Sequence, residues 1–212
     1  MIRVLDLFCG AGGAAMGFRR LGFYVVGVDI KPQPRYAGDE FYQADAMRWL
    51  ADKELMSGWD LVWASPPCQC YTVLKSCFDN SAYPDLVAPV RELLEASGLP
   101  YVIENVVGAP VRRDLMLCAN YFGLRSYRHR LFESNFKLIQ PEHPPHVIRV
   151  NRRKMRRKAH WDEGGFVSVV GDIGRYVGPE AMDINWMTGA ELSQAISPRY
   201  SEYIGKQYLM HV

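Results

Sequence analysis

Short apolar runs alternate with helical spacings along the first half of the chain. Runs rich in β-branched and aromatic residues that end in turn residues predict buried strands, and apolar positions recurring every three or four residues predict helices. The predicted strands are Arg3–Phe8, Tyr24–Val28, Phe41–Tyr42, Leu61–Ala64 and Pro100–Ile103, the last ending at Glu104-Asn105. The predicted helices are Ala14–Leu21, Ala46–Leu55 and Leu86–Ala96. This alternation predicts an α/β fold with a doubly wound, mostly parallel sheet of the Rossmann-like kind.

The second half of the chain is less regular. The segment between the fourth strand and the third helix, Gln69–Pro84, is polar and irregular, as active-site lids are. Further predicted elements are a short helix at Asp114–Tyr121 ended by Gly123, a strand at Tyr127–Ser134, a proline-rich linker at Gln140–His146, a glycine-rich stretch at Gly164–Gly178, and two tail helices that begin at the capping box Thr188–Glu191 and at Ser197-Pro198.

A glycine turn joins the first strand to the first helix. Gly10, Gly12 and Gly13 let the backbone approach a ligand, and the helix start supplies free amide donors. Asp29 ends the second strand, where Rossmann-like sites place the acceptor for ribose hydroxyls. Asp45 precedes the next helix and is either its N-cap or a contact to the adenine end of a cofactor. Together these residues predict a nucleotide-like cofactor.

Residues with reactive side chains also follow the fourth strand and end the fifth. Pro66 and Pro67 stop the fourth strand, and Cys68 comes next, at the sheet edge where open α/β sheets bind ligands. Cys68 is either one more buried cysteine or a nucleophile. Glu104 ends the neighbouring strand and is expected at the same edge.

Composition limits the classes of protein to which the chain can belong. The 212 residues carry a net charge of +2 and five cysteines without paired spacing, which favours a reducing, cytoplasmic setting over a disulfide framework. No apolar run predicts a membrane span. A metal site built from Cys68, Cys70 and His129 has poor spacing, so we expect no metal. The segment Arg149–Lys158, the basic run, is either a solvated stretch or an arm that contacts phosphates.

Four ordered motifs resemble those of the cytosine-C5 methyltransferases. They are DLFCGAGG at Asp6–Gly13, PPCQ at Pro66–Gln69, ENV at Glu104–Val106 and RHR at Arg128–Arg130. The resemblance covers about Val4–Phe136 and resumes over Ala181–Tyr208. It implies a methyltransferase fold, S-adenosylmethionine as the cofactor, and methyl transfer to carbon 5 of cytosine in duplex or single-stranded DNA, as in the restriction-modification systems of bacteria and phages.

The resemblance also assigns residues. It implies cofactor contacts from Phe8, Gly10, Gly12, Gly13, Asp29, Ile30, Asp45, Pro67 and Gln194, with simple core packing as the alternative for Phe8 and Ile30. Implied nucleic-acid contacts are Gln69, Thr72 and Lys75 in the lid and Arg152, Arg153, Arg156 and Arg157 in the basic run.

The chemistry explains the implied catalytic residues. Carbon 5 of cytosine is a poor nucleophile until a thiolate, here Cys68, adds at carbon 6. Glu104 would supply a proton at N3, and its burial would raise its pKa toward that task. Arg130 would hold the base's O2 and Arg128 would orient the acid or the thiolate, with a surface ion pair as the alternative for both. The reacting base must be flipped out or unpaired.

The chain departs from the resemblance in its recognition region. We expect a catalytic core at residues 1–136, a reduced basic insert at 137–176 in place of a target-recognition domain, and C-terminal helices at 177–212 that pack back on the core of a monomer. Ser126 stands where the family commonly has glutamine, and Ser193-Gln194 replace a Gly-Asn pair. The short insert keeps RNA or a free cytosine nucleotide open as substrates, and a non-catalytic nucleic-acid-binding homologue is a third possibility.

Overall fold

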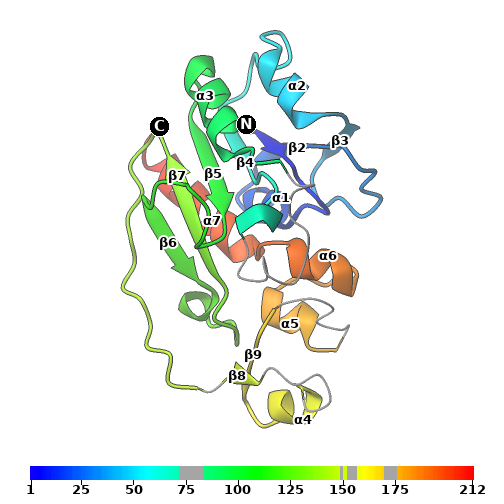
Figure 1. The fold of residues 1–212 in the computed structure, drawn as a ribbon, viewed down its shortest axis with the longest axis vertical. Coiled ribbons are helices and arrows are strands. Elements are labelled where there is room, and N and C mark those ends of the chain that lie inside the picture. Colours follow the sequence, from blue (N-terminus) through cyan, green and yellow to red (C-terminus); the bar gives the residue numbers. More distant parts are fainter. Residues whose placement is uncertain (72–83, 149, 152–156, 170–175) are drawn as a thin grey trace.

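The computed structural model describes residues 1–71, 84–148, 150–151, 157–169 and 176–212. Within these residues a seven-stranded sheet in the order β3-β2-β1-β4-β5-β7-β6 forms the centre of the molecule (Figure 1). Its strands are β1 (Arg3–Leu7), β2 (Tyr24–Asp29), β3 (Glu40–Gln43), β4 (Leu61–Ala64), β5 (Tyr101–Asn105), β6 (Leu115–Cys118) and β7 (His129–Ser134). Only β7 runs antiparallel to its neighbours, so the predicted doubly wound, mostly parallel sheet is confirmed.

Helices cover both faces of the sheet. Alternate residues of β4 serve opposite faces: Leu61 and Trp63 pack with α1 and α7, whereas Val62 and Ala64 pack with α2 and α3. The helices are α1 (Gly13–Arg19), α2 (Ala46–Ala51), α3 (Val87–Ser97), α4 (Arg157–Asp162), α5 (Gly178–Met182), α6 (Gly189–Gln194) and α7 (Pro198–Leu209), with 3-10 turns η1 (Gln69–Tyr71) and η4 (Ala119–Phe122).

The C-terminal helix returns to the first helix, as the sequence predicts. A Cβ atom on Gly17 would lie 2.1 Å from the Ser201 Oγ and 2.2 Å from the carbonyl oxygen of Pro198. Gly13 is equally crowded, because its Cβ would lie 2.4 Å from the carbonyl oxygen of Ile196. Glycines therefore let α1, which follows the glycine turn, lie directly against α7.

Two predicted helices differ from the structure. The helix expected at Asp114–Tyr121 is wrong: this segment forms β6 and then η4, because its apolar residues pair with β7 in the sheet. Gly123 does end it, with φ near +75°. Helix α2 ends at Ala51 rather than Leu55, since the Asp52 carboxylate accepts from the amides of Glu54 and Leu55 and starts a turn.

The elements β8 (Val150–Asn151), α4, β9 (Phe166–Val167) and α5 lie below the sheet (Figure 1). The two short strands, β8 and β9, pair in parallel there. A third apolar cluster packs Trp161 and Val169 against Ala181 and Leu192, so packing crosses the domain boundary expected after residue 176. Both predicted tail caps, Thr188 and Ser197, are confirmed. None of the helices in the described ranges is long and apolar enough to cross a membrane.

Candidate active site

The strand order reverses between β1 and β4, and the predicted site lies where these strands end. Open α/β sheets bind ligands in the crevice at the carboxyl ends of the strands at such a reversal. The glycine turn follows β1, Cys68 is the fourth residue after β4, and Glu104 lies at the end of β5. The topology therefore brings the predicted cofactor turn, thiol and carboxyl to one edge.

The turn that carries Cys68 is tied to the next strand. The Asn105 side-chain amide donates to the carbonyl oxygen of Pro66 at 3.0 Å, within a buried pair. A Cβ atom on Gly108 would lie 2.6 Å from the carbonyl oxygen of Tyr71, so this glycine lets the chain after β5 approach η1. The Pro-Pro-Cys turn is thus held by β5, the strand that ends in Glu104.

Glu104 and Arg130 form a buried ion pair across β5 and β7. Glu104 lies opposite Phe132, so Arg130, two residues earlier in β7, shares its face of the sheet. Arg130 Nε lies 2.8 Å from Glu104 Oε1, and the two side chains are 11% and 8% exposed. Among the described residues, none provides an aligned hydrogen-bond donor to that oxygen.

The electrostatics of this pair extend to Cys68. Burial raises the pKa of Glu104, and the neighbouring Arg130 opposes that rise without cancelling it. Burial likewise raises the pKa of the Cys68 thiol, while Arg130 lowers it, Glu104 raises it and Arg128 lowers it. Thiol, carboxyl and guanidinium therefore interact with one another, as an acid and a nucleophile acting on one ring require.

Arg128 is buried, and it is bound to backbone rather than to the acid or the thiol. Its Nη1 donates to the carbonyl oxygen of Val169 at 2.7 Å, and its Nη2 donates to those of Ser193 and Ala195 at 2.9 and 2.8 Å. Burial and the like charge of Arg130 lower the pKa of Arg128 to about 9. Among the described residues Arg128 acts on Glu104 and Cys68 through its charge, and its role in orienting the acid or the thiolate stays a prediction.

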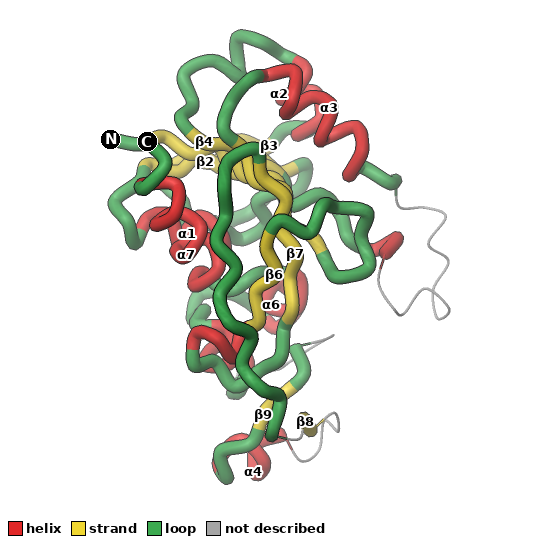
Figure 2. Tube along the Cα trace, turned by 90° about the vertical axis from the view of Figure 1, so that its left-hand side faces the viewer, coloured by secondary structure: helices red, strands yellow, loops and turns green. Residues whose placement is uncertain are grey.

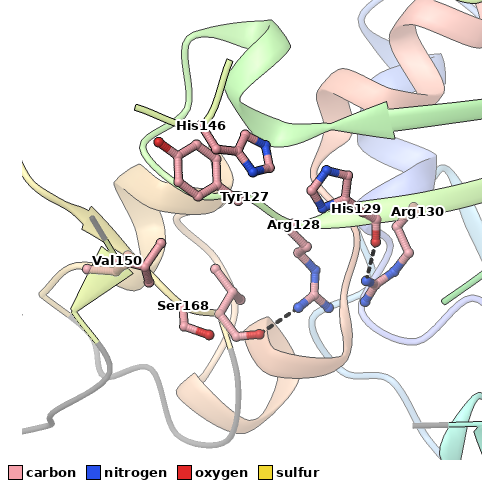
Figure 3. A pocket seen from close by; sticks show the side chains of 9 residues that line it. Tyr127, Arg128, His129, Arg130, His146, Val150 and Ser168 are labelled. Atoms are coloured by element: carbon pink, nitrogen blue, oxygen red, sulfur yellow. Dashed lines mark hydrogen bonds between the residues drawn. The ribbon is translucent and has the colours of Figure 1, made fainter. Parts of the chain in front are cut away.

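A cavity of about 400 Å³ opens beside the two arginines (Figure 3). Its lining comes from the start of β7, from β9 and the residues after it, and from the segment before β8. Arg128 and Arg130 line it, whereas Cys68 and Glu104 do not. This volume is in the range of small-molecule sites, and the cavity is joined to the buried ion pair through Arg130.

The glycine turn has the conformation that a cradle needs. Gly10 and Gly12 have φ of +50° and +80°, and nothing lies within 4 Å of a Cβ built on Gly10. The Asp29 carboxylate accepts from the amides of Gly10 and Lys31 at 3.0 and 2.9 Å, which holds it at the tip of β2. Ile30, next to it, is 66% exposed, an apolar side chain left open beside the turn.

Other predicted cofactor residues have structural roles. Asp45 is the N-cap of α2, because its Oδ1 accepts from the Met47 amide at 2.9 Å, so that alternative is confirmed. Phe8 has the left-handed φ of +57° and packs partly on the α2–α3 core. Pro67 is half-buried and Gln194 is exposed at the end of α6. Their cofactor contacts stay predictions.

Most predicted nucleic-acid contacts lie outside the described residues. These are Thr72 and Lys75 in the lid, and Arg152, Arg153 and Arg156 in the basic run. Gln69 begins η1 directly after Cys68, and the backbone of Arg157 begins α4. These roles stay predictions.

Sequence reasoning missed the residues that assemble the site. Asn105 ties two strand ends, and the Tyr200 hydroxyl of α7 donates to the carbonyl oxygen of Arg128. The sequence does contain a signal for a role of Asn105, since two polar residues in succession end an otherwise apolar strand. The sequence contains no such signal for Tyr200, because its hydrogen-bond partner lies 72 residues away.

Comparisons with known proteins agree with this arrangement. No protein-family model matches the chain. Type II methyltransferase M.AgeI of Thalassovita gelatinovora is 26% identical, over 69% of this chain and 43% of that protein. The probable DNA (cytosine-5)-methyltransferase of Frog virus 3 (isolate Goorha) is 33% identical over 102 residues, which are 47% of this chain and 44% of that protein. The chain thus spans less than half the length of these two relatives.

Solved structures match over the whole chain. A putative DNA modification methyltransferase encoded within an E. coli prophage superimposes with a TM-score of 0.62 at 15% identity and covers 100% of both chains. The S. pombe Dnmt2 methyltransferase also gives 0.62, at 14% identity, over 99% of this chain and 98% of that one. The chain therefore has the Rossmann-like fold of the methyltransferases. The resemblance to the cytosine-C5 methyltransferases is confirmed by the sequence relatives.

Proposed function

We propose that this chain transfers a methyl group from S-adenosylmethionine to carbon 5 of cytosine in DNA, through a covalent bond from Cys68 to carbon 6. The observation that carries the proposal is the mutual interaction of the Cys68 thiol, the Glu104 carboxyl and the Arg130 guanidinium at one sheet edge. A binding module has no need for a half-buried thiol at the same sheet edge as a buried acid paired with a buried cation.

The glycine turn fits the cofactor. Open space at Gly10 leaves room for a ligand against the backbone, and Asp29 is fixed where ribose hydroxyls are bound in Rossmann-like sites. The exposed Ile30 offers an apolar surface to a purine. S-adenosylmethionine, when bound, supplies the methyl group. Gly10, Gly12, Asp29 and Ile30 would hold it.

Cys68 and Glu104 divide the proton chemistry between them. The thiolate forms a bond to carbon 6, and the electron pair of the 5,6 double bond moves toward carbon 5 and the N3 side of the ring. Glu104 is paired with Arg130 in the free chain. Because burial raises its pKa, it takes up a proton when the base binds, gives that proton to N3 and returns to the carboxylate that Arg130 stabilises. After carbon 5 has taken the methyl group, water removes the carbon 5 proton, the 5,6 double bond re-forms as the Cys68 thiolate leaves, and N3 gives up its proton to restore neutral cytosine.

DNA is the proposed substrate on the strength of the relatives, since the Frog virus 3 protein is named a DNA (cytosine-5)-methyltransferase. The reacting carbon is buried in a stacked duplex, so the base must be extruded or unpaired. The seven positive charges of the basic run would supply affinity for phosphates without reading sequence.

The test is transfer of tritiated methyl from S-adenosylmethionine to duplex DNA, single-stranded DNA, tRNA and dCMP in parallel. We expect label in DNA cytosine for the unaltered chain and none for Cys68→Ser, with cofactor binding retained by the variant in calorimetry. Label in tRNA or dCMP alone would overturn the DNA assignment.

A second measurement tests the covalent step. DNA containing 5-fluorocytosine should trap the chain as a denaturation-resistant complex, since the fluorine at carbon 5 cannot leave as a proton does. Cys70→Ser is the matched control, because this cysteine lies two residues away in η1, and it should trap normally. Trapping that persists in Cys68→Ser would assign the nucleophile to another residue.

A further inference from the structure

Four side chains with metal-ligating atoms meet at the outer edge of the sheet, away from the thiol and the carboxyl of the active site. They are Cys118 at the end of β6, His129 at the start of β7, and His143 and His146 in the segment between β7 and β8. One ligand atom from each lies within 4.8 Å of all the others. We propose that these four residues bind one zinc ion in a tetrahedral structural site.

The spacing of the ligand atoms is close to that of a zinc site. The Cys118 Sγ lies 3.5 Å from the His146 Nε2, and the His129 Nε2 lies 2.9 Å from the His143 Nε2. Tetrahedral bonds of about 2.3 Å to sulfur and 2.0–2.1 Å to nitrogen would separate these pairs by about 3.6 and 3.3 Å. These two pairs therefore lie within a few tenths of an ångström of zinc-ligand spacing, and the other pairs lie within 4.8 Å.

The neighbouring structure holds the ligands in place. Cys118 and His129 are direct cross-strand partners in the β6–β7 ladder. The Gln140 side chain bonds to both the amide and the carbonyl of Met116, at 2.8 and 2.9 Å, so the segment bearing the two other histidines runs along the edge of β6 (Figures 1 and 2).

The last ligand is held by an aromatic contact. The His146 ring stacks on Tyr127 with centroids 3.8 Å apart, as Figure 3 shows, and the Tyr127 hydroxyl bonds to the amide and carbonyl of Ile148. A loose surface histidine would have no such support.

The chemistry of the donors selects the ion. Three imidazoles and one thiolate suit zinc and disfavour magnesium or calcium, which prefer oxygen. Four protein ligands fill a tetrahedral shell, as structural zinc sites do. The ion would fasten β6, β7 and the segment after β7 to one another, directly beside the arginines of the active site. This departs from the expectation that no metal is bound, which considered His129 only with Cys68 and Cys70.

The test measures metal in the untagged full chain. After saturation with zinc and dialysis against metal-free buffer, we expect about one zinc per chain. His143→Ala and Cys118→Ser should each weaken zinc binding by more than the about 10–100-fold loss typical of an outer-shell partner. His211→Ala and Cys70→Ser are matched controls, a histidine and a cysteine outside the cluster, and both should keep the ion.

A spectroscopic measurement gives its main result on the unaltered chain. Cobalt added to the metal-free chain should give the intense thiolate charge-transfer band of a sulfur-ligated tetrahedral ion, and Cys118→Ser should lose that band while circular dichroism reports its fold. A chain that retains no zinc, or a cobalt spectrum without the thiolate band, would show that the four side chains are only a packed ring cluster. Equal zinc content in His143→Ala and His211→Ala would overturn the assignment too.

Discussion

Replacing Glu104 with glutamine is expected to slow methyl transfer while making the Cys68 thiol more reactive. Glutamine keeps the shape of the side chain but cannot give a proton to N3. Loss of a positioned general acid costs about 10²–10⁴-fold in rate, which corresponds to about 3–5 kcal/mol. The opposite effect on the thiol follows from charge, because Glu104 raises the pKa of Cys68 whereas Arg130 lowers it.

The structure also sets the cost to stability. The side chains of Glu104 and Arg130 are 8% and 11% exposed, so the substitution leaves a nearly buried cation without its partner. Breaking such a pair costs about 3–5 kcal/mol. Urea unfolding measures this loss, and the rate assays belong at a temperature where circular dichroism shows the variant folded.

The assay follows alkylation of Cys68 by iodoacetamide, resolved by mass spectrometry of its peptide, in a Cys70→Ser background. The thiolate is the reactive form, so the rate at pH 7 should rise in Glu104→Gln and fall in Arg130→Gln. Glu95→Gln is the matched control, since this acid is 53% exposed on α3 and should change neither rate. Slower alkylation in Glu104→Gln, or unimpaired methyl transfer, would refute a shared site.

Three further results are expected. Gly17→Ala should destabilise the chain by about 1–3 kcal/mol in urea unfolding, because its methyl meets the backbone of Pro198 at 2.2 Å; no loss would mean that α7 shifts freely. Arg91→Met should cost about 1.5–3 kcal/mol, because it removes the guanidinium that pairs with the fully buried Glu133 carboxylate at 2.5 Å and leaves Arg112 as the remaining partner. Burial alone would raise the pKa of Glu133, but hydrogen bonds from Arg91 and from the Arg112 amide outweigh it and lower the pKa. The stabilisation is therefore present above the unfolded pKa and lost as pH falls through the lower folded pKa, and Arg91→Met should flatten that acid limb. Neutralising the arginines of the basic run should reduce the slope of log binding constant against log salt concentration by about 0.9 per phosphate contact removed. An unchanged slope would show that the basic run does not contact phosphates.

Local signals predicted the elements that lie on the parallel part of the sheet. Apolar runs, the glycine turn and the two proline stops carry their information within a few residues, so β1, β2, β4 and β5 were placed within one or two residues. The same holds for the caps at Thr188 and Ser197.

The errors arise where a distant partner decides the structure. The segment Leu115–Cys118 is a strand because β7 pairs with it, and its four residues carry too little pattern to distinguish a strand from a helix. The four-residue cluster at the sheet edge was missed for a related reason. The sequence offers Cys68 and Cys70 as possible co-ligands of His129, but the sheet register places His129 opposite Cys118 instead.

The three residues of the RHR motif, at the start of β7, each make a different kind of interaction. Arg128 donates to carbonyls from the insert and from the end of α6, which fastens the region after β7 to the active site. His129 joins the histidine and cysteine cluster, and Arg130 pairs with the carboxyl. Because Arg128 has three backbone partners and Arg130 has the acid, loss of the first guanidinium should loosen the fold and loss of the second should impair the chemistry. The insert contributes one of the three carbonyls that hold Arg128, that of Val169, whereas Arg130 is held by Glu104, so neither arginine needs a large added domain for its anchoring.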